Sequence, residues 1–155
     1  MRKALWLLTL LALAFTWFIT VSALTGPNRL PDKIPTHFNA AGEPNAWGTS
    51  TGLFLLPALA TGICLLLAVV GLNPSSFRYP IRITPENRGR LYALGAQTMA
   101  FLTLETAFLF AVLQYSFLQA FRTNHFSLNP AIVPIFTGII LLTTVAHVVL
   151  MHKSN

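Results

Sequence analysis

Charged residues are scarce in this chain: they make up 9% of its 155 residues, against about 25% in soluble domains. Only four residues are acidic, whereas 54% are hydrophobic. This composition excludes an ordinary soluble domain and predicts an integral membrane protein. The net charge of +6 does not indicate nucleic-acid binding, because the basic residues flank apolar segments, where membrane proteins place them.

Cysteine is also scarce, since Cys64 is the single one and lies within an apolar run. The chain therefore forms no internal disulfide and no cysteine metal cluster. No His-Glu-x-x-His motif and no phosphate-binding glycine loop occurs, and no arrangement of a nucleophile with a base is evident. We therefore expect neither enzyme activity nor a cofactor.

Four stretches reach the roughly 20 predominantly apolar residues that a bilayer-crossing helix needs. They predict an all-α membrane protein with four transmembrane helices in a single domain, residues 1–155. The first stretch has a rival interpretation as a signal peptide, because Val21-Ser22-Ala23 resembles a cleavage site. Its apolar run exceeds the ~7–15 residues of a signal core, so we expect a retained helix. The expected spans are residues 5–24, 53–72, 91–118 and 131–151, with loops at 25–52 and 73–90 and a third at 119–130.

Basic residues are distributed unevenly between the two sides of the predicted membrane. Cytoplasmic loops carry an excess of Lys and Arg. The side with more basic residues is therefore expected in the cytoplasm, together with both termini, and the loop at 25–52 is expected outside. Seven basic residues lie on the first side (Arg2, Lys3, Arg78, Arg82, Arg88, Arg90 and Lys153) and three on the second (Arg29, Lys33 and Arg122).

The longest polar insert is Leu30–Gly48, within the first loop. Pro27, Pro31 and Pro35 keep its first half extended, because the residue before each proline is pushed out of the α region. Gly42 suits a turn that needs positive φ. We expect a short hairpin on the outer membrane surface, with strands at Ile34–Asn39 and Pro44–Gly48.

The third span has a recognisable start. Thr84 suits the N-cap position and Pro85 the first helical position, and an acidic residue follows in the first turn. A helix from Pro85 to Gln119 would be about 52 Å long, which exceeds the hydrocarbon core of about 30 Å. Its first two turns should therefore protrude, with Arg88 and Arg90 at the lipid headgroups, where they serve topology and contact with anionic lipid.

The polar insert resembles the signature loop of a bacterial membrane domain of unknown function, which forms the N-terminal part of SdpI-type immunity proteins. The matching string is Leu-Pro-Asp-Lys-Ile-Pro-Thr-His-Phe-Asn at 30–39, followed by Gly42 and by Trp47-Gly48. A second match spans residues 73–87. We expect the signature residues either to contact a partner or to hold the loop: Pro31, Ile34, Pro35, His37, Phe38, Asn39, Gly42 and Trp47.

The resemblance covers about Leu13 to Ala68 and implies a multi-pass protein of the bacterial plasma (inner) membrane. Resistance to a secreted killing peptide is the role of one branch of that family. The present chain departs from this branch, because SdpI carries a longer membrane region after the shared domain. Immunity is therefore a hypothesis for this chain and not an assignment.

Glu105 is the one carboxylate inside an expected span, near the bilayer midplane. Such a group costs of order 2.5–3.5 kcal/mol on insertion scales and is a candidate functional residue. Thr98 lies seven residues earlier on nearly the same helix face. Two roles stay open: a protonated side chain that hydrogen-bonds a neighbouring helix, and a proton-linked or ligand-linked function. His147 should lie about 10 Å or more away along the membrane normal, so we expect no direct pair.

His37 and His125 both lie in expected outer loops, and imidazole binds zinc and copper. No ligand spacing typical of a metal motif accompanies them. We expect His37 to hydrogen-bond loop backbone or to recognise a partner, and we expect no metal site.

Three functional hypotheses follow. The first is a small non-enzymatic membrane protein whose outer loop binds or excludes a secreted peptide, or senses a signal. The second is an accessory subunit of a larger membrane complex. The third is transport linked to protonation of Glu105, which would require a homo-oligomer, because four helices enclose little space. The expected partners are the lipid bilayer and a secreted peptide or another membrane protein.

Overall fold

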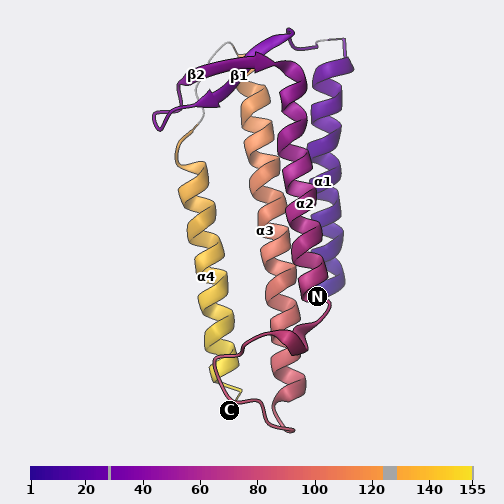
Figure 1. The fold of residues 1–155 in the computed structure, drawn as a ribbon, viewed down its shortest axis with the longest axis vertical. Helices are drawn as coiled ribbons and strands as arrows, with labels where there is room; N and C mark the ends of the chain where they lie inside the picture. Colours follow the sequence, from indigo (N-terminus) through magenta and orange to yellow (C-terminus); the bar gives the residue numbers. More distant parts are fainter. Residues whose placement is uncertain (28, 124–128, 155) are drawn as a thin grey trace.

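Four long helices stand side by side, and a two-stranded hairpin lies across one end of the bundle (Figure 1). The structure is a computed structural model that describes residues 1–27, 29–123 and 129–154. Each helix is long and apolar enough to cross a membrane, when α2 is counted with the short 3-10 helix η1 before it. The predicted spans are thus confirmed as helices and suggest a multi-pass membrane protein. The bounds are α1 (Arg2–Thr25), η1 (Ser50–Phe54), α2 (Leu55–Gly71), α3 (Arg88–Arg122) and α4 (Ile132–His152).

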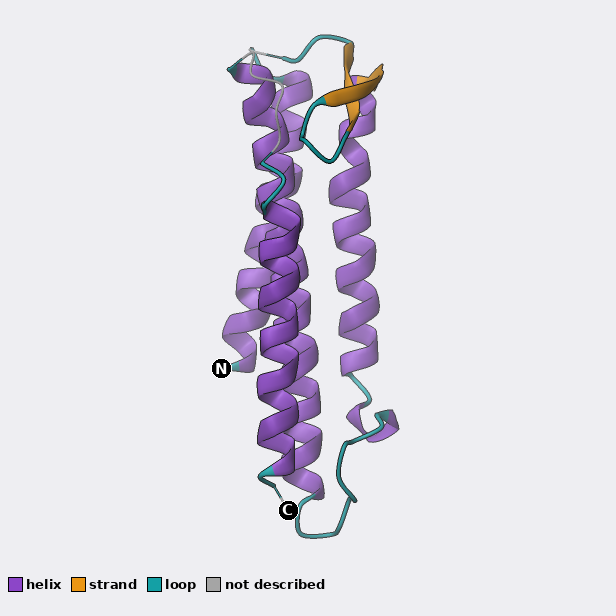
Figure 2. Cartoon of the chain, turned by 90° about the vertical axis from the view of Figure 1, so that its left-hand side faces the viewer, coloured by secondary structure: helices purple, strands orange, loops and turns teal. Residues whose placement is uncertain are grey.

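The two ends of the bundle differ in structure (Figures 1 and 2). We call the end that carries the hairpin the hairpin end, and the end at which the chain's N- and C-termini lie the terminal end. At the terminal end, α3 extends beyond the first turn of α1 and the last turn of α2 (Figure 1). Its 35 residues span about 52 Å, the length expected for a helix that protrudes from a bilayer.

Helix α3 is the element on which the others pack, since α1, α2 and α4 all contact it. Small residues line its buried side and let the neighbouring helices approach closely. The polar side chains buried along it are threonines and one glutamine. The buried alanines are Ala96, Ala100, Ala107, Ala111 and Ala120. Gly95 instead makes room for Phe77 and Tyr79 of the preceding loop.

Helix α4 is the least buried of the four, and it stands apart from α1 and α2 in Figure 1. Only 6% of its most apolar window is buried, against 22–28% in the other helices. Its two buried residues, His147 and Met151, lie in its second half. Most of the α4 surface therefore faces lipid or another protein.

Gln114 joins three elements near the hairpin end. Its side chain is completely buried, and its Nε2 donates hydrogen bonds to Thr20 Oγ1 of α1 (2.7 Å) and to the Leu53 carbonyl of η1 (3.4 Å). A further interhelical bond runs from Trp17 Nε1 of α1 to Thr61 Oγ1 of α2 (3.0 Å). These bonds fix α1, α2 and α3 relative to one another where the hairpin sits on them.

Helix α3 begins at Arg88, three residues after the predicted start at Pro85. The Thr84 amide donates to Asn87 Oδ1 (2.8 Å), and the Asn87 amide donates to Thr84 Oγ1 (3.4 Å). This reciprocal pair has the geometry of a capping box. A hydrogen bond from the Thr84 side chain lowers the pKa of Glu86 below its ordinary value. The N-cap residue of α3 is Asn87, so the predicted N-cap role of Thr84 and the predicted first helical position of Pro85 are wrong. The pair of Thr84 and Asn87 closes the turn that precedes the helix.

We predict that Gln114→Ala lowers the free energy of unfolding by about 1–3 kcal/mol, because it removes two interhelical hydrogen bonds and opens a cavity. Thermal unfolding in detergent micelles measures the effect. The matched control is Gln119→Ala, since Gln119 donates to Tyr115 Oη on its own helix. A control as destabilised as Gln114→Ala would contradict this role for Gln114.

Candidate functional site

The polar insert forms the hairpin predicted from the sequence. Strand β1 (Lys33–Phe38) pairs antiparallel with strand β2 (Pro44–Thr49), each within one residue of its predicted bounds. The pairing is irregular around His37. Pro35 has no N–H to donate to the ladder, and such residues occur in edge strands and at bulges.

Asn39 organises the turn of the hairpin. Its Oδ1 accepts hydrogen bonds from the amides of Ala41 (3.0 Å) and Glu43 (2.9 Å), and its Nδ2 donates to Glu43 Oε2 (3.1 Å). Gly42 has a φ of 82°, a conformation that costs other residues about 1–2 kcal/mol. Asn39 and Gly42 therefore shape the turn. The positive φ predicted for Gly42 is confirmed, whereas a contact of Asn39 with a partner stays a prediction.

Strand β1 attaches the hairpin to the helices. Ile34 is 1% exposed and packs in a cluster with Leu53 of η1 and Phe117 of α3. Pro35 is fully buried, and the Phe38 ring meets the Phe117 ring edge-on with centroids 5.3 Å apart. The hairpin is thus a fixed part of the bundle surface.

Three other signature residues of the hairpin region, Pro31, His37 and Trp47, are exposed. Pro31 is exposed ahead of β1, and Trp47 is 52% exposed on β2, in register with Pro35. His37 is exposed, and its Nδ1 lies 2.6 Å from Asn45 Oδ1. The expectation that His37 bonds loop backbone is therefore wrong: its partner is a side chain of the facing strand.

A groove of about 370 Å³ lies between the hairpin and the helices. We call it the hairpin groove. Strand β1 forms one wall, and η1, the start of α2 and the part of α3 near the hairpin end form the other. Its lining is mainly apolar, with the exposed His37 at its edge. The lining includes Ile34, Pro35, His37 and Phe38 of β1, Leu55 of α2, and Leu113 and Phe117 of α3. Such a groove can accept an apolar side chain and offer it one polar partner.

Among the described residues, no group of three or more His, Cys, Asp or Glu side chains lies close enough to hold a metal ion. His37 is the described histidine at the hairpin end. His125, its proposed partner in a metal site, lies outside the described residues.

A polar contact joins α3 to α4 at Glu105. Thr143 Oγ1 donates to Glu105 Oε1 at 2.6 Å, whereas the buried Oε2 has no hydrogen-bond partner among the described residues. Thr98 does not take part, since its hydroxyl donates to the Leu94 carbonyl of its own helix (2.8 Å). Glu105 therefore bonds a neighbouring helix, as the structural hypothesis predicted, and its proton-linked role stays a prediction.

His147 lies one helical turn beyond this contact. Its Nδ1 lies 2.9 Å from the Thr143 carbonyl, and its ring lies 5.4 Å from that of Phe101. Because Thr143 is level with Glu105, the offset of His147 along the helix is about 6 Å, smaller than the 10 Å expected. No direct hydrogen bond joins Glu105 to His147, and the buried Nε2 of His147 is also without a partner among the described residues.

The sequence also contains a Gly-x-Ser-x-Gly motif that was not predicted as a site: residues 48–52 read Gly-Thr-Ser-Thr-Gly. This is the spacing of a hydrolase nucleophile elbow. Ser50 begins η1 directly after β2. Among the described residues, no histidine or carboxylate hydrogen-bonds its hydroxyl. The motif alone therefore gives no reason to assign catalysis, because a nucleophilic serine needs an adjacent base.

The region that matches a known family overlaps the region, about Leu13 to Ala68, that resembles the signature domain in the sequence. Residues 4–61, which hold α1, the hairpin, η1 and the start of α2, match the family described as "Domain of unknown function (DUF1648)". An uncharacterized protein of Archaeoglobus fulgidus is 38% identical over 68 residues, which are 42% of this chain and 36% of the archaeal protein. The matched region thus spans about a third of that relative. No solved structure matches the chain.

We predict that Thr143→Val lowers the free energy of unfolding by about 1 kcal/mol, because it leaves Glu105 Oε1 without its interhelical donor. The control is Thr144→Val, since Thr144 donates to the Ile140 carbonyl of its own helix. Thermal unfolding in the same detergent compares them. Equal loss in the two variants would show that the Glu105 contact contributes nothing specific.

Proposed function

We propose that the hairpin end faces the outside of a bacterial cell and that the hairpin groove binds an apolar segment of a secreted, membrane-active peptide. The observation that carries this proposal is the groove itself, whose wall is built from the signature residues Ile34, Pro35 and Phe38. In this interpretation those three residues hold the wall in place, and His37 and Leu55 meet the ligand. The protein would act as a binding module and not as an enzyme.

The distribution of charge supports this orientation. The terminal end carries most of the basic residues, and loops with an excess of Lys and Arg stay in the cytoplasm. With that end inside, the groove opens at the outer face, where a secreted peptide arrives. Apolar residues of such a peptide leave water for the groove, and a fixed hairpin loses little entropy when it binds them.

The resemblance to SdpI-type immunity proteins supports a protective role. A membrane-active peptide harms the cell when it inserts into the bilayer. A protein that binds the peptide at the outer surface would lower the amount that is free to insert, and it needs no catalytic group for this. Sensing of the peptide would use the same groove, with a partner protein that detects occupancy.

The second candidate function is that of an accessory subunit, which the exposure of α4 favours. Its most apolar window is 6% buried. The Glu105 contact lies on the opposite side of α4, against α3. A larger partner that covers α4 would co-purify in mild detergent at a fixed ratio. A lone monomer or homodimer would argue against this function.

We predict that the hairpin turn is reached from outside the cell. In a Cys64→Ala background, Ala41→Cys places a thiol in the exposed turn, and Ser76→Cys places one in the exposed loop at the terminal end. A membrane-impermeant maleimide should label the first variant in intact cells and the second only after permeabilisation. The reverse pattern would place the groove on the cytoplasmic side and overturn the proposal.

We predict that the protein raises the survival of a sensitive strain against at least one member of a panel of membrane-active bacterial peptides, and that Leu55→Trp abolishes this protection. Tryptophan at position 55 fills the groove from the start of α2. Leu59→Trp is the matched control, because Leu59 is exposed one turn further along α2 and does not line the groove.

Survival is compared at equal amounts of protein in the membrane. Unchanged survival across the whole panel would contradict the immunity function. Equal protection by the Leu55→Trp and Leu59→Trp variants would show that the peptide binds elsewhere.

A further inference from the structure

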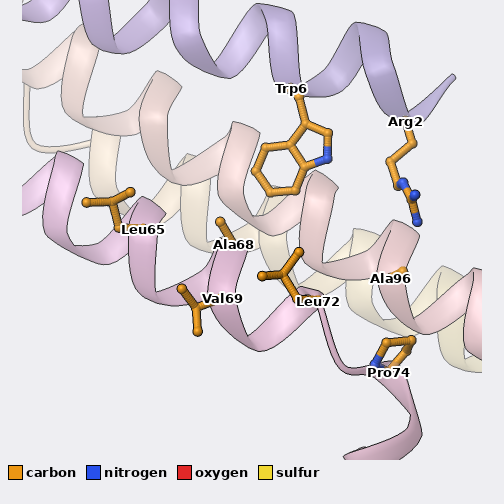
Figure 3. Close-up of a pocket in the computed structure, with 9 residues that line it drawn as sticks. Arg2, Trp6, Leu65, Ala68, Val69, Leu72, Pro74 and Ala96 are labelled. Atoms are coloured by element: carbon orange, nitrogen blue, oxygen red, sulfur yellow. The ribbon is translucent and has the colours of Figure 1, made fainter.

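A second groove, of about 450 Å³, lies at the terminal end between α1, α2 and α3. We call it the terminal-end groove. Figure 3 shows Trp6 of α1 facing Ala68 and Leu72 of α2, and Arg2 pointing toward Ala96 of α3 and Pro74. Small residues in the lining are Ala68 of α2 and Ala96 of α3, whereas Gly71 makes room for the Met99 side chain of α3. Arg2 is the charged residue in the lining.

The position of this groove favours a lipid as its occupant. It lies beside the first residues of α1 and the last turn of α2, where these helices would reach the membrane interface. From Leu65 to Leu72 its apolar wall on α2 is about 10 Å long. Trp6 lines the groove on the α1 side, and tryptophan is enriched at the level of the headgroups. An acyl chain therefore fits the apolar part of the groove.

The positive charge of Arg2, in the lining of the terminal-end groove, favours a lipid with an anionic headgroup. The Arg2 side chain is exposed and has no hydrogen-bond or ion-pair partner among the described residues. Guanidinium groups bind phosphate through two parallel hydrogen bonds. Glu86 is the one acidic residue of this end, against many basic ones, so the surface attracts anionic lipid. The other basic residues of the terminal end are Lys3, Arg78, Arg82, Arg88, Arg90 and Lys153.

We propose that the terminal-end groove binds one anionic phospholipid, with an acyl chain against Trp6 and Val69 and the phosphate on Arg2. The site is independent of the hairpin groove, because the two lie at opposite ends of the bundle. Bound lipid would fill the space between α1 and α2 and stabilise the bundle by mass action.

Lipid titration of the purified full-length chain in mild detergent, read by native mass spectrometry, tests the headgroup. One phosphatidylglycerol should bind about fivefold more tightly than phosphatidylcholine with the same acyl chains. Arg2→Gln should remove most of this preference. Lys3→Gln is the matched control, because Lys3 is the adjacent exposed basic residue and does not line the groove. Both side chains are exposed, so both variants should fold.

A second pair of variants tests the groove. Val69→Trp fills it, whereas Val70→Trp adds the same bulk at an exposed neighbour that does not line it. Val69→Trp should lower the bound fraction of both lipids, and Val70→Trp should leave it unchanged. Equal loss of preference in Arg2→Gln and Lys3→Gln, or full lipid occupancy in Val69→Trp, would overturn the proposal and indicate diffuse binding to the protein surface.

Discussion

Polar groups inside a bilayer must find partners within the protein, because the hydrocarbon core offers no hydrogen bonds. In this chain the backbone meets that demand by forming helices wherever the sequence is apolar, and threonine hydroxyls return to the carbonyls of their own turns. The side chains that reach further fix the arrangement of the helices. Gln114 joins α3 to α1 and η1, and Thr143 joins α4 to Glu105 of α3. Each of these bonds forms only when the two elements that it joins are aligned as they are in this structure.

The hairpin lies at one end of the bundle and meets its hydrogen-bonding needs in a different way from the helices. Its polar groups are paired by Asn39 at the turn and by the strand ladder, and its apolar residues pack on the bundle through Ile34. The result is a wall that is packed on the bundle instead of a free loop. This packing links the fold to the proposed function, because a groove between fixed walls can select the shape of an apolar ligand, whereas a flexible loop would lose entropy on binding.

The two ends of the bundle carry grooves of different chemistry. The hairpin groove is apolar with a histidine at its edge, and the terminal-end groove is apolar with an arginine at its mouth. The first suits a peptide segment and the second an anionic lipid. Helix α4 contributes to neither lining, and its exposed apolar surface leaves room for a subunit partner.

The sequence by itself determined the number of candidate spans, the turn at Gly42 and both strands of the hairpin, because apolar length, proline and glycine restrict the backbone locally. Only the tertiary structure decided the partners of Gln114, His37 and Glu105, and the two grooves. These depend on how the helices are rotated and shifted against one another. The side of a membrane helix that faces lipid is as apolar as the side that packs, so periodicity along the sequence does not reveal which residues meet.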